Sequence, residues 1–152
     1  MIAAITSVRT ISQKYLLLSL LLIVPLFLTG PQIITGSIVN FLLLSISNKT
    51  NKNSWLLISA IPSLMATVFT PYLFYLWPII TIANYSFITI AKKNIILAIT
   101  VKSIILFLCA SILFKLNLIP SIILISMGTI QIITASIGSI GFLTYERITK
   151  AK

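Results

Sequence analysis

Lys102 is the one charged side chain inside a long apolar stretch, residues 94–114. A lysine in such a setting has two common fates. It extends its charge along the apolar stem toward the nearer end of its helix, or neighbouring polar groups hold it inside the protein, where it presents a cation to an anionic ligand. The sequence leaves both interpretations open. Only the second interpretation gives Lys102 a role in binding.

The few other polar residues that lie far from the loops are mostly amides and hydroxyls, and several belong to a repeated element. Residues 32–38 read QIITGSI and residues 131–137 read QIITASI, with six of the seven positions identical. An amide without a partner costs several kcal/mol in an apolar medium, so these side chains are expected to face the protein interior. The candidate substrate-binding residues are Gln32, Thr35, Asn40, Asn84, Lys102, Gln131 and Thr134.

The same residues also fit a purely structural role. Gly36, Ala135, Gly138 and Ser139 are small enough to let two helices approach closely. Hydroxyls and amides hydrogen-bond across such contacts. Helix packing alone therefore competes with a ligand site that shares these residues.

Most catalytic and metal chemistry has no residues to use in this chain. It has no His, no Asp, one Cys (Cys109) and one Glu (Glu146). A metal site needs clustered ligands, and general acid–base catalysis needs two titratable groups. No GxxxxGK[ST] phosphate-binding loop is present either, so the chain is expected to be no enzyme, to hold no metal or cofactor, and to depend on a partner for any ATP hydrolysis.

Composition determines which elements must position these residues. Of all residues 59% are apolar and 8% are charged. Such a chain has too few polar side chains to cover a water-facing surface. Its apolar segments show no alternation of apolar and polar residues, which favours helices over strands. The sequence predicts an all-α integral membrane bundle of about six short transmembrane helices in a single domain, 1–152. The expected helices are 15–30, 31–47, 54–70, 71–91, 94–114 and 129–145, with Pro62 and Pro78 inside two of them and freeing backbone carbonyls there.

The positive charges indicate the orientation. The net charge is +10, but the basic residues are scattered in ones and twos and form no nucleic-acid patch. With six spans, nearly all of them fall on one side and only Lys115 on the other, which predicts a multi-pass protein of the cell membrane with cytoplasmic N- and C-termini. The basic loops are then expected to contact anionic lipids.

The apolar segment 116–128 permits two interpretations. It is either a half-helix or lid that enters the outer half of the membrane, or it lengthens the last helix.

Several of these segments together resemble a known family, the substrate-binding S components of energy-coupling-factor (ECF) transporters. The resemblance rests on PQIITGSIVN at 31–40, IPSL at 61–64, PIITIAN at 78–84, Lys102, and QIITA at 131–135. It implies six helices, a small-molecule substrate such as a vitamin bound near the outer face, and two kinds of partner, a transmembrane coupling subunit and cytoplasmic ATPases.

The chain also departs from that family. Many S components carry an A-x-x-x-A docking surface on the first helix, whereas residues 15–28 contain no alanine. The lack of His and Asp argues against a nickel or cobalt substrate. The alternative function is a structural or assembly membrane protein whose buried amides serve only helix packing.

Overall fold

The fold is helical throughout the part of the chain that the computed structural model describes, residues 2–27, 32–68 and 74–151, with side chains from residue 11 to 26 in the first range. The elements in chain order are α1 (Ile2–Phe27), α2 (Gln32–Ser47), η1 (Lys52–Ser54), α3 (Trp55–Thr67), α4 (Trp77–Ala91), α5 (Ile95–Lys115), α6 (Ser121–Ile125), the π-helical turn η3 (Ser126–Ile130) and α7 (Gln131–Lys150). Because α6, η3 and α7 form one continuous helical segment, Ser121–Lys150, the described residues build a bundle of six helices. The predicted all-α class is confirmed.

Local sequence explains several helix ends. The side chain of Asn94 caps α5 by accepting a hydrogen bond from the backbone N–H of Leu97 at 3.0 Å. Pro120 precedes α6 in an extended conformation, which suits a residue just before a helix. Asn117, in the turn between α5 and α6, has φ 57°. This is a left-handed conformation that asparagine tolerates better than most residues.

Three predicted boundaries differ from the structure. The first helix begins at Ile2 and not at residue 15, because Lys14, which precedes the apolar run 15–28, does not interrupt the helix. The last helix begins at Ser121 and not at 129, so the segment before Gly128 lengthens this helix and is no separate lid. The fourth helix, predicted from residue 71, begins at Trp77, so Pro78 lies in its first turn, where the missing N–H frees no carbonyl, whereas Pro62 does lie within α3. The helix boundaries predicted between residues 30 and 31 and between residues 70 and 71 lie outside the described residues.

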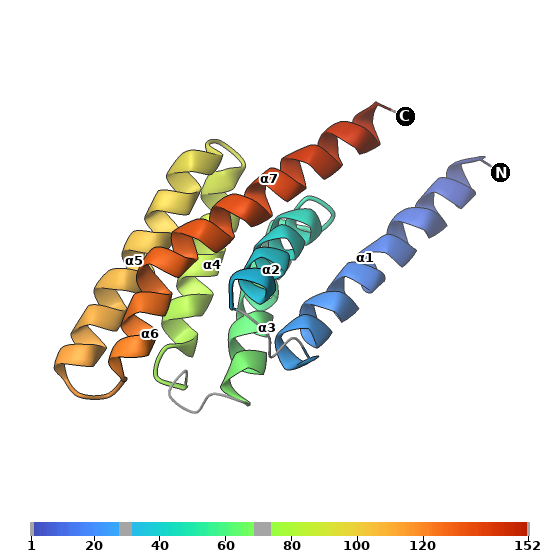
Figure 1. Ribbon diagram of the computed structural model, residues 1–152. Coiled ribbons are helices and arrows are strands. Elements are labelled where there is room, and N and C mark those ends of the chain that lie inside the picture. The colour runs from blue at the N-terminus through green and yellow to red at the C-terminus, as the bar shows by residue number, and fades with distance from the viewer. Residues whose placement is uncertain (1, 28–31, 69–73, 152) are drawn as a thin grey trace.

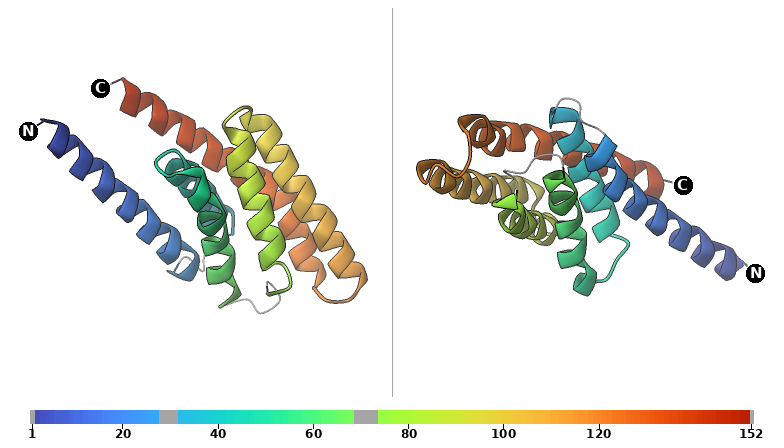
Figure 2. Two further views of the ribbon diagram at one scale, coloured as in Figure 1. Left: turned by 180° about the vertical axis from the view of Figure 1, so that it is seen from behind. Right: turned by 90° about the horizontal axis from the view of Figure 1, so that it is seen from below.

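Helices α2 and α7, which carry the two copies of the repeated element, run side by side in the same direction (Figure 1). Gln32 at the start of α2 hydrogen-bonds Ser126, just before α7, and Asn48 after α2 hydrogen-bonds Glu146 near the end of α7 at 3.3 Å. The views in Figure 2 show α1 on one flank of the bundle and α5 on the other.

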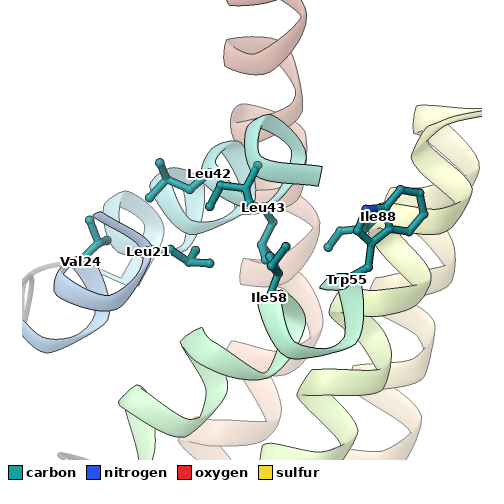
Figure 3. Packing of buried hydrophobic residues seen from close by; sticks show 8 residues of the cluster. Leu21, Val24, Leu42, Leu43, Trp55, Ile58 and Ile88 are labelled. Atoms are coloured by element: carbon teal, nitrogen blue, oxygen red, sulfur yellow. The ribbon is translucent and has the colours of Figure 1, made fainter. Parts of the chain in front are cut away.

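The apolar core is divided among several helix contacts. One cluster joins α1, α2, α3 and α4 (Figure 3) and consists of Leu21, Val24, Leu42, Leu43, Ile46, Trp55, Ile58 and Ile88. A second lies between α4, α5 and the α6–η3 segment, and a third, which includes Phe87 and Phe142, lies between α2, α4, α5 and α7. The close packing of these side chains, through many van der Waals contacts, helps to hold the helices together.

The outer surface of the bundle is also strongly apolar. Leu57 of α3, Ile96 of α5, Ile122 of α6 and Ile140 of α7 are 65–73% exposed. Soluble proteins rarely expose large apolar side chains over so much of their surface. By length and composition, Ile95–Lys115 and Ser121–Lys150 are the two described helices that could cross a membrane.

Candidate functional site

Lys102 lies in the interior of the bundle, with only 3% of its surface exposed. Its ammonium Nζ donates hydrogen bonds to Asn40 Oδ1 of α2 at 2.5 Å and to Asn84 Oδ1 of α4 at 2.7 Å. Neighbouring helices therefore hold this side chain, and the interpretation in which it extends toward the helix end is wrong.

The two asparagines extend the contact to further helices. Asn40 Nδ2 donates to Thr134 Oγ1 of α7 at 3.4 Å, and Asn84 Nδ2 donates to the backbone carbonyl of Ser59 in α3 at 3.2 Å. We call Lys102, Asn40, Asn84 and Thr134 the polar core. Through its hydrogen bonds the polar core connects α2, α3, α4, α5 and α7, so each of these helices has a fixed rotation about its axis relative to the others.

The polar core contains a cation but no anion. The Lys102 ammonium lies 4.9 Å from the centroid of the Phe87 ring, a favourable but weak cation–π distance. The only acidic residue of the chain, Glu146, instead pairs with Lys150 at 3.0 Å near the end of α7. Within the described structure this buried ammonium therefore contacts amide dipoles and an aromatic face, which stabilise a charge less than a carboxylate would.

Two glycines allow the close approach of α2 and α7 that forms the polar core. A Cβ atom on Gly138 would lie 2.6 Å from the Ser37 carbonyl oxygen and 2.7 Å from Asn40 Cβ. A Cβ atom on Gly36 would lie 2.9 Å from Thr134 Cγ2. The residues that the sequence identifies as small helix-contact positions therefore do lie in the contact, directly beside Asn40 and Thr134.

The remaining predicted site residues lie away from Lys102. Gln32 is exposed and lies about two turns before Asn40 on α2. Its Nε2 donates a hydrogen bond to Ser126 Oγ. Gln131 is half-buried and contacts the polar core through its backbone carbonyl, which accepts from Thr134 Oγ1 at 3.2 Å. Thr35, one turn after Gln32 on α2, is half-buried. The structure thus joins Asn40, Asn84, Lys102 and Thr134 and leaves the two glutamines at the helix starts.

Phe87, Ser59 and Ser126 take part in these contacts but are not among the residues that the sequence predicts. Phe87 lies three residues after Asn84, hence on the same face of α4, and this spacing is the signal that could have identified it. The contacts of Ser59, through its carbonyl, and of Ser126 depend on packing between distant segments, for which the sequence carries no signal.

A second polar group lies at the end of the bundle that holds the turns after α2 and α4 and the last part of α7 (Figure 1). Lys92 Nζ donates to Asn48 Oδ1 at 2.5 Å and lies 5.3 Å from the centroid of the Trp55 ring. Partial burial lowers the pKa of Lys92, Glu146 opposes this shift, and Lys52 adds to it. We call this region the basic end, since these turns and the end of α7 also carry Lys49, Lys93, Arg147 and Lys150.

Two cavities are lined entirely by described residues that lie outside the polar core. One of about 340 Å³ lies between α5 and the η3–α7 segment. The other, of about 200 Å³, lies at the basic end beside Asn48, Lys92 and Glu146. Among the residues that the structure describes, no three His, Cys, Asp or Glu side chains come together as a metal site would require.

No family model, curated protein or solved structure matches this chain.

Proposed function

We propose that the chain is a multi-pass integral protein of the cell membrane, with about six spans and both termini in the cytoplasm. The apolar outer surface supports this location, because lipid would cover side chains that water would otherwise contact. The orientation is supported by the basic end, since positive charges are enriched on the cytoplasmic side and attract anionic lipid headgroups there.

Within this setting we propose that the protein is the substrate-binding membrane subunit of an ATP-dependent importer of the energy-coupling-factor type. The observation that carries this is a buried ammonium that contacts only neutral groups within the described residues. A charged residue inside a membrane protein is costly and is generally retained for function. A small anionic molecule would supply the missing negative charge.

The polar core has groups suited to such a ligand. An ammonium has three N–H donors, and two of them are used by Asn40 and Asn84. The side-chain NH₂ groups of these asparagines make bonds of 3.4 Å and 3.2 Å. Both are longer than the usual N–H···O bond of about 3.0 Å. A carboxylate could therefore accept from Lys102 and from a re-oriented amide with little loss of existing hydrogen bonding.

We assign no catalytic step to this chain, since it lacks a pair of titratable groups at the polar core. ATP hydrolysis would come from cytoplasmic ATPases through a transmembrane coupling subunit, because the chain has no phosphate-binding loop of its own. Gln32, Thr35 and Gln131, at the opposite end of the bundle from the basic end, would lie along the route by which a solute enters from outside.

A structural or assembly role is the second candidate, and a different observation favours it. Lys102 and both asparagines already hydrogen-bond one another or neighbouring helices within the described residues. In this case Lys102 and the asparagines fix the helix register and bind nothing else.

One comparison separates the two functions. The full chain and its Lys102→Met variant are purified in mild detergent from a strain that carries the whole transporter, and bound small molecules and co-purifying proteins are identified by mass spectrometry. Lys93→Met, at an exposed lysine, is the control. The importer subunit should carry an anionic molecule and an ATPase, and Lys102→Met should lose the molecule while it keeps the fold.

Absence of any bound molecule from the unchanged protein, together with unaltered solute uptake in Lys102→Met, would overturn the importer function. A folded and more stable Lys102→Met protein that still assembles with its partners would support the structural role, because replacing a buried charge that has no anionic partner removes a desolvation cost.

A further inference from the structure

The cavity of about 340 Å³ between α5 and the η3–α7 segment is apolar and lies apart from the polar core. Its lining includes Thr100, Ser103, Ile104, Phe107, Gly128 and Ile132 and no charged side chain. Ile104 and Ile132 are each 50% exposed, so the cavity opens on the outer side of the bundle. Its volume falls within the range of about 300–1,000 Å³ that is typical of small-molecule sites.

The π-helical turn η3 shapes one wall of this cavity. Gly128 in this turn packs against the Phe107 ring so closely that a Cβ atom would lie 2.9 Å from Phe107 Cδ2. A π-helical turn within an α-helix is rare and is frequently found at a functional site. Here it brings Gly128 and Thr129 into the wall.

Ser103 adds an unsatisfied polar group to this lining. Its Oγ is fully buried and has no hydrogen-bond partner in the described structure. Other hydroxyls of α5 behave differently: Thr100 Oγ1 donates to the Ile96 carbonyl at 3.1 Å, and Ser111 Oγ donates to the Phe107 carbonyl at 2.7 Å. Because helical serines usually satisfy themselves in this way, the hydroxyl of Ser103 is left available for an external acceptor.

We propose that this cavity is a second ligand site, which binds an uncharged, largely apolar molecule with one hydrogen-bond acceptor, such as a ketone or quinone carbonyl. Ser103 donates the hydrogen bond, and the isoleucines and Phe107 contact the apolar body. The ligand enters sideways between Ile104 and Ile132, from the lipid if the chain has the membrane location proposed above. Binding involves none of the polar-core residues, so this proposal does not depend on the proposed role of Lys102.

Benzophenone is a suitable probe, because it is an apolar ketone that inserts into nearby C–H bonds on illumination. The full chain in detergent is illuminated with increasing benzophenone, and labelled peptides are identified by mass spectrometry. Three variants are compared. Ile104→Trp fills the mouth of the cavity, Ile96→Trp places the same side chain elsewhere on α5 at a position that is 73% exposed, and Ser103→Ala removes the hydroxyl.

The expected result is saturable labelling within residues 99–107 and 128–132. Ile104→Trp should reduce it several-fold and Ile96→Trp should not. Ser103→Ala should raise the half-saturating concentration by about 2- to 10-fold, the usual effect of one hydrogen bond. It should leave competition by 2-ethylnaphthalene, which has no acceptor, unchanged.

The proposal would be overturned if labelling does not saturate, follows side-chain exposure over the whole surface, and is insensitive to Ile104→Trp. Such a result would show that the cavity holds only detergent or acyl chains. Saturable labelling that Ser103→Ala leaves unchanged would overturn the assignment of Ser103 as the donor. Neither result depends on whether Lys102 binds an anion.

Discussion

Lys102 Nζ of α5 lies 2.5 Å from Asn40 Oδ1 of α2, although 62 positions separate the two residues in the chain. The contact ties α5 to α2, and through Asn40 Nδ2 to Thr134 of α7. A buried ammonium with amide acceptors of this kind makes the helix packing specific, since a rotated helix would leave the charge without partners, but burial of the charge itself carries a desolvation cost.

Removal of the Asn40 amide should therefore be costly. Asn40→Ala leaves the Lys102 ammonium with one amide acceptor fewer in a buried position, and we expect the free energy of unfolding in detergent to fall by about 1–3 kcal/mol. An SDS titration followed by circular dichroism measures this change.

The same measurement on Lys102→Met and on the double variant, which carries both Lys102→Met and Asn40→Ala, completes a double-mutant cycle. Once the charge is gone, Asn40→Ala should cost clearly less, which gives a coupling energy of about 1–2 kcal/mol. Equal costs in the two backgrounds would mean that the contact between Lys102 and Asn40 contributes nothing to stability.

The helix contact beside Asn40 gives a second prediction, with a matched pair of glycines one turn apart on α7. The Cβ of Gly138→Ala would lie 2.6 Å from a backbone oxygen that cannot move alone. This substitution should destabilise the bundle by about 1–3 kcal/mol. Gly141→Ala meets only Phe41 Cδ2 at 3.6 Å. Helix propensity should dominate there and raise stability by up to about 1 kcal/mol. Thermal unfolding of both variants tests this prediction, which requires the two changes in stability to have opposite signs.

The cap of α5 gives a third prediction. Asn94→Ala removes the acceptor for the Leu97 N–H. It should lower the free energy of unfolding by about 0.5 to about 2 kcal/mol, whereas Asn94→Asp should retain most of the stability. Asn51 precedes η1 but makes no side-chain cap hydrogen bond, so Asn51→Ala serves as the control. A surface change of this kind should alter stability by less than about 0.5 kcal/mol. If both alanine variants lose equal stability, capping is not the cause.

The residues of the polar core can be predicted from the sequence, because charges and amides within apolar helices must find partners inside the protein. Asn40, Asn84, Lys102 and Thr134 are all candidates on this ground. Which acceptor meets which donor cannot be predicted, since Lys102 is 62 and 18 residues from its two acceptors and only the packing of the helices places them together.

The errors have local causes. The predicted first helix starts directly after Lys14, but lysine and arginine are good helix formers, and α1 extends back to Ile2. The predicted last helix starts after Gly128, whereas this glycine lies within the π-helical turn and packs against Phe107. The identity of the repeated segments suggests equivalent roles for Gln32 and Gln131, but the former bonds through its side chain and the latter through its carbonyl.

Accessibility of single cysteines tests the proposed orientation. Cys109 is the only cysteine, so a Cys109→Ser background allows one thiol to be introduced at a time. Asn51→Cys, in the turn at the basic end, should react with a membrane-impermeant maleimide only after the cells are opened. Leu116→Cys, in the exposed turn between α5 and α6, is the matched position and should react in intact cells. Labelling of Asn51→Cys alone from outside would reverse the orientation. Labelling of both thiols in intact cells would contradict a membrane bundle, because the two turns lie at opposite ends of the molecule (Figure 2).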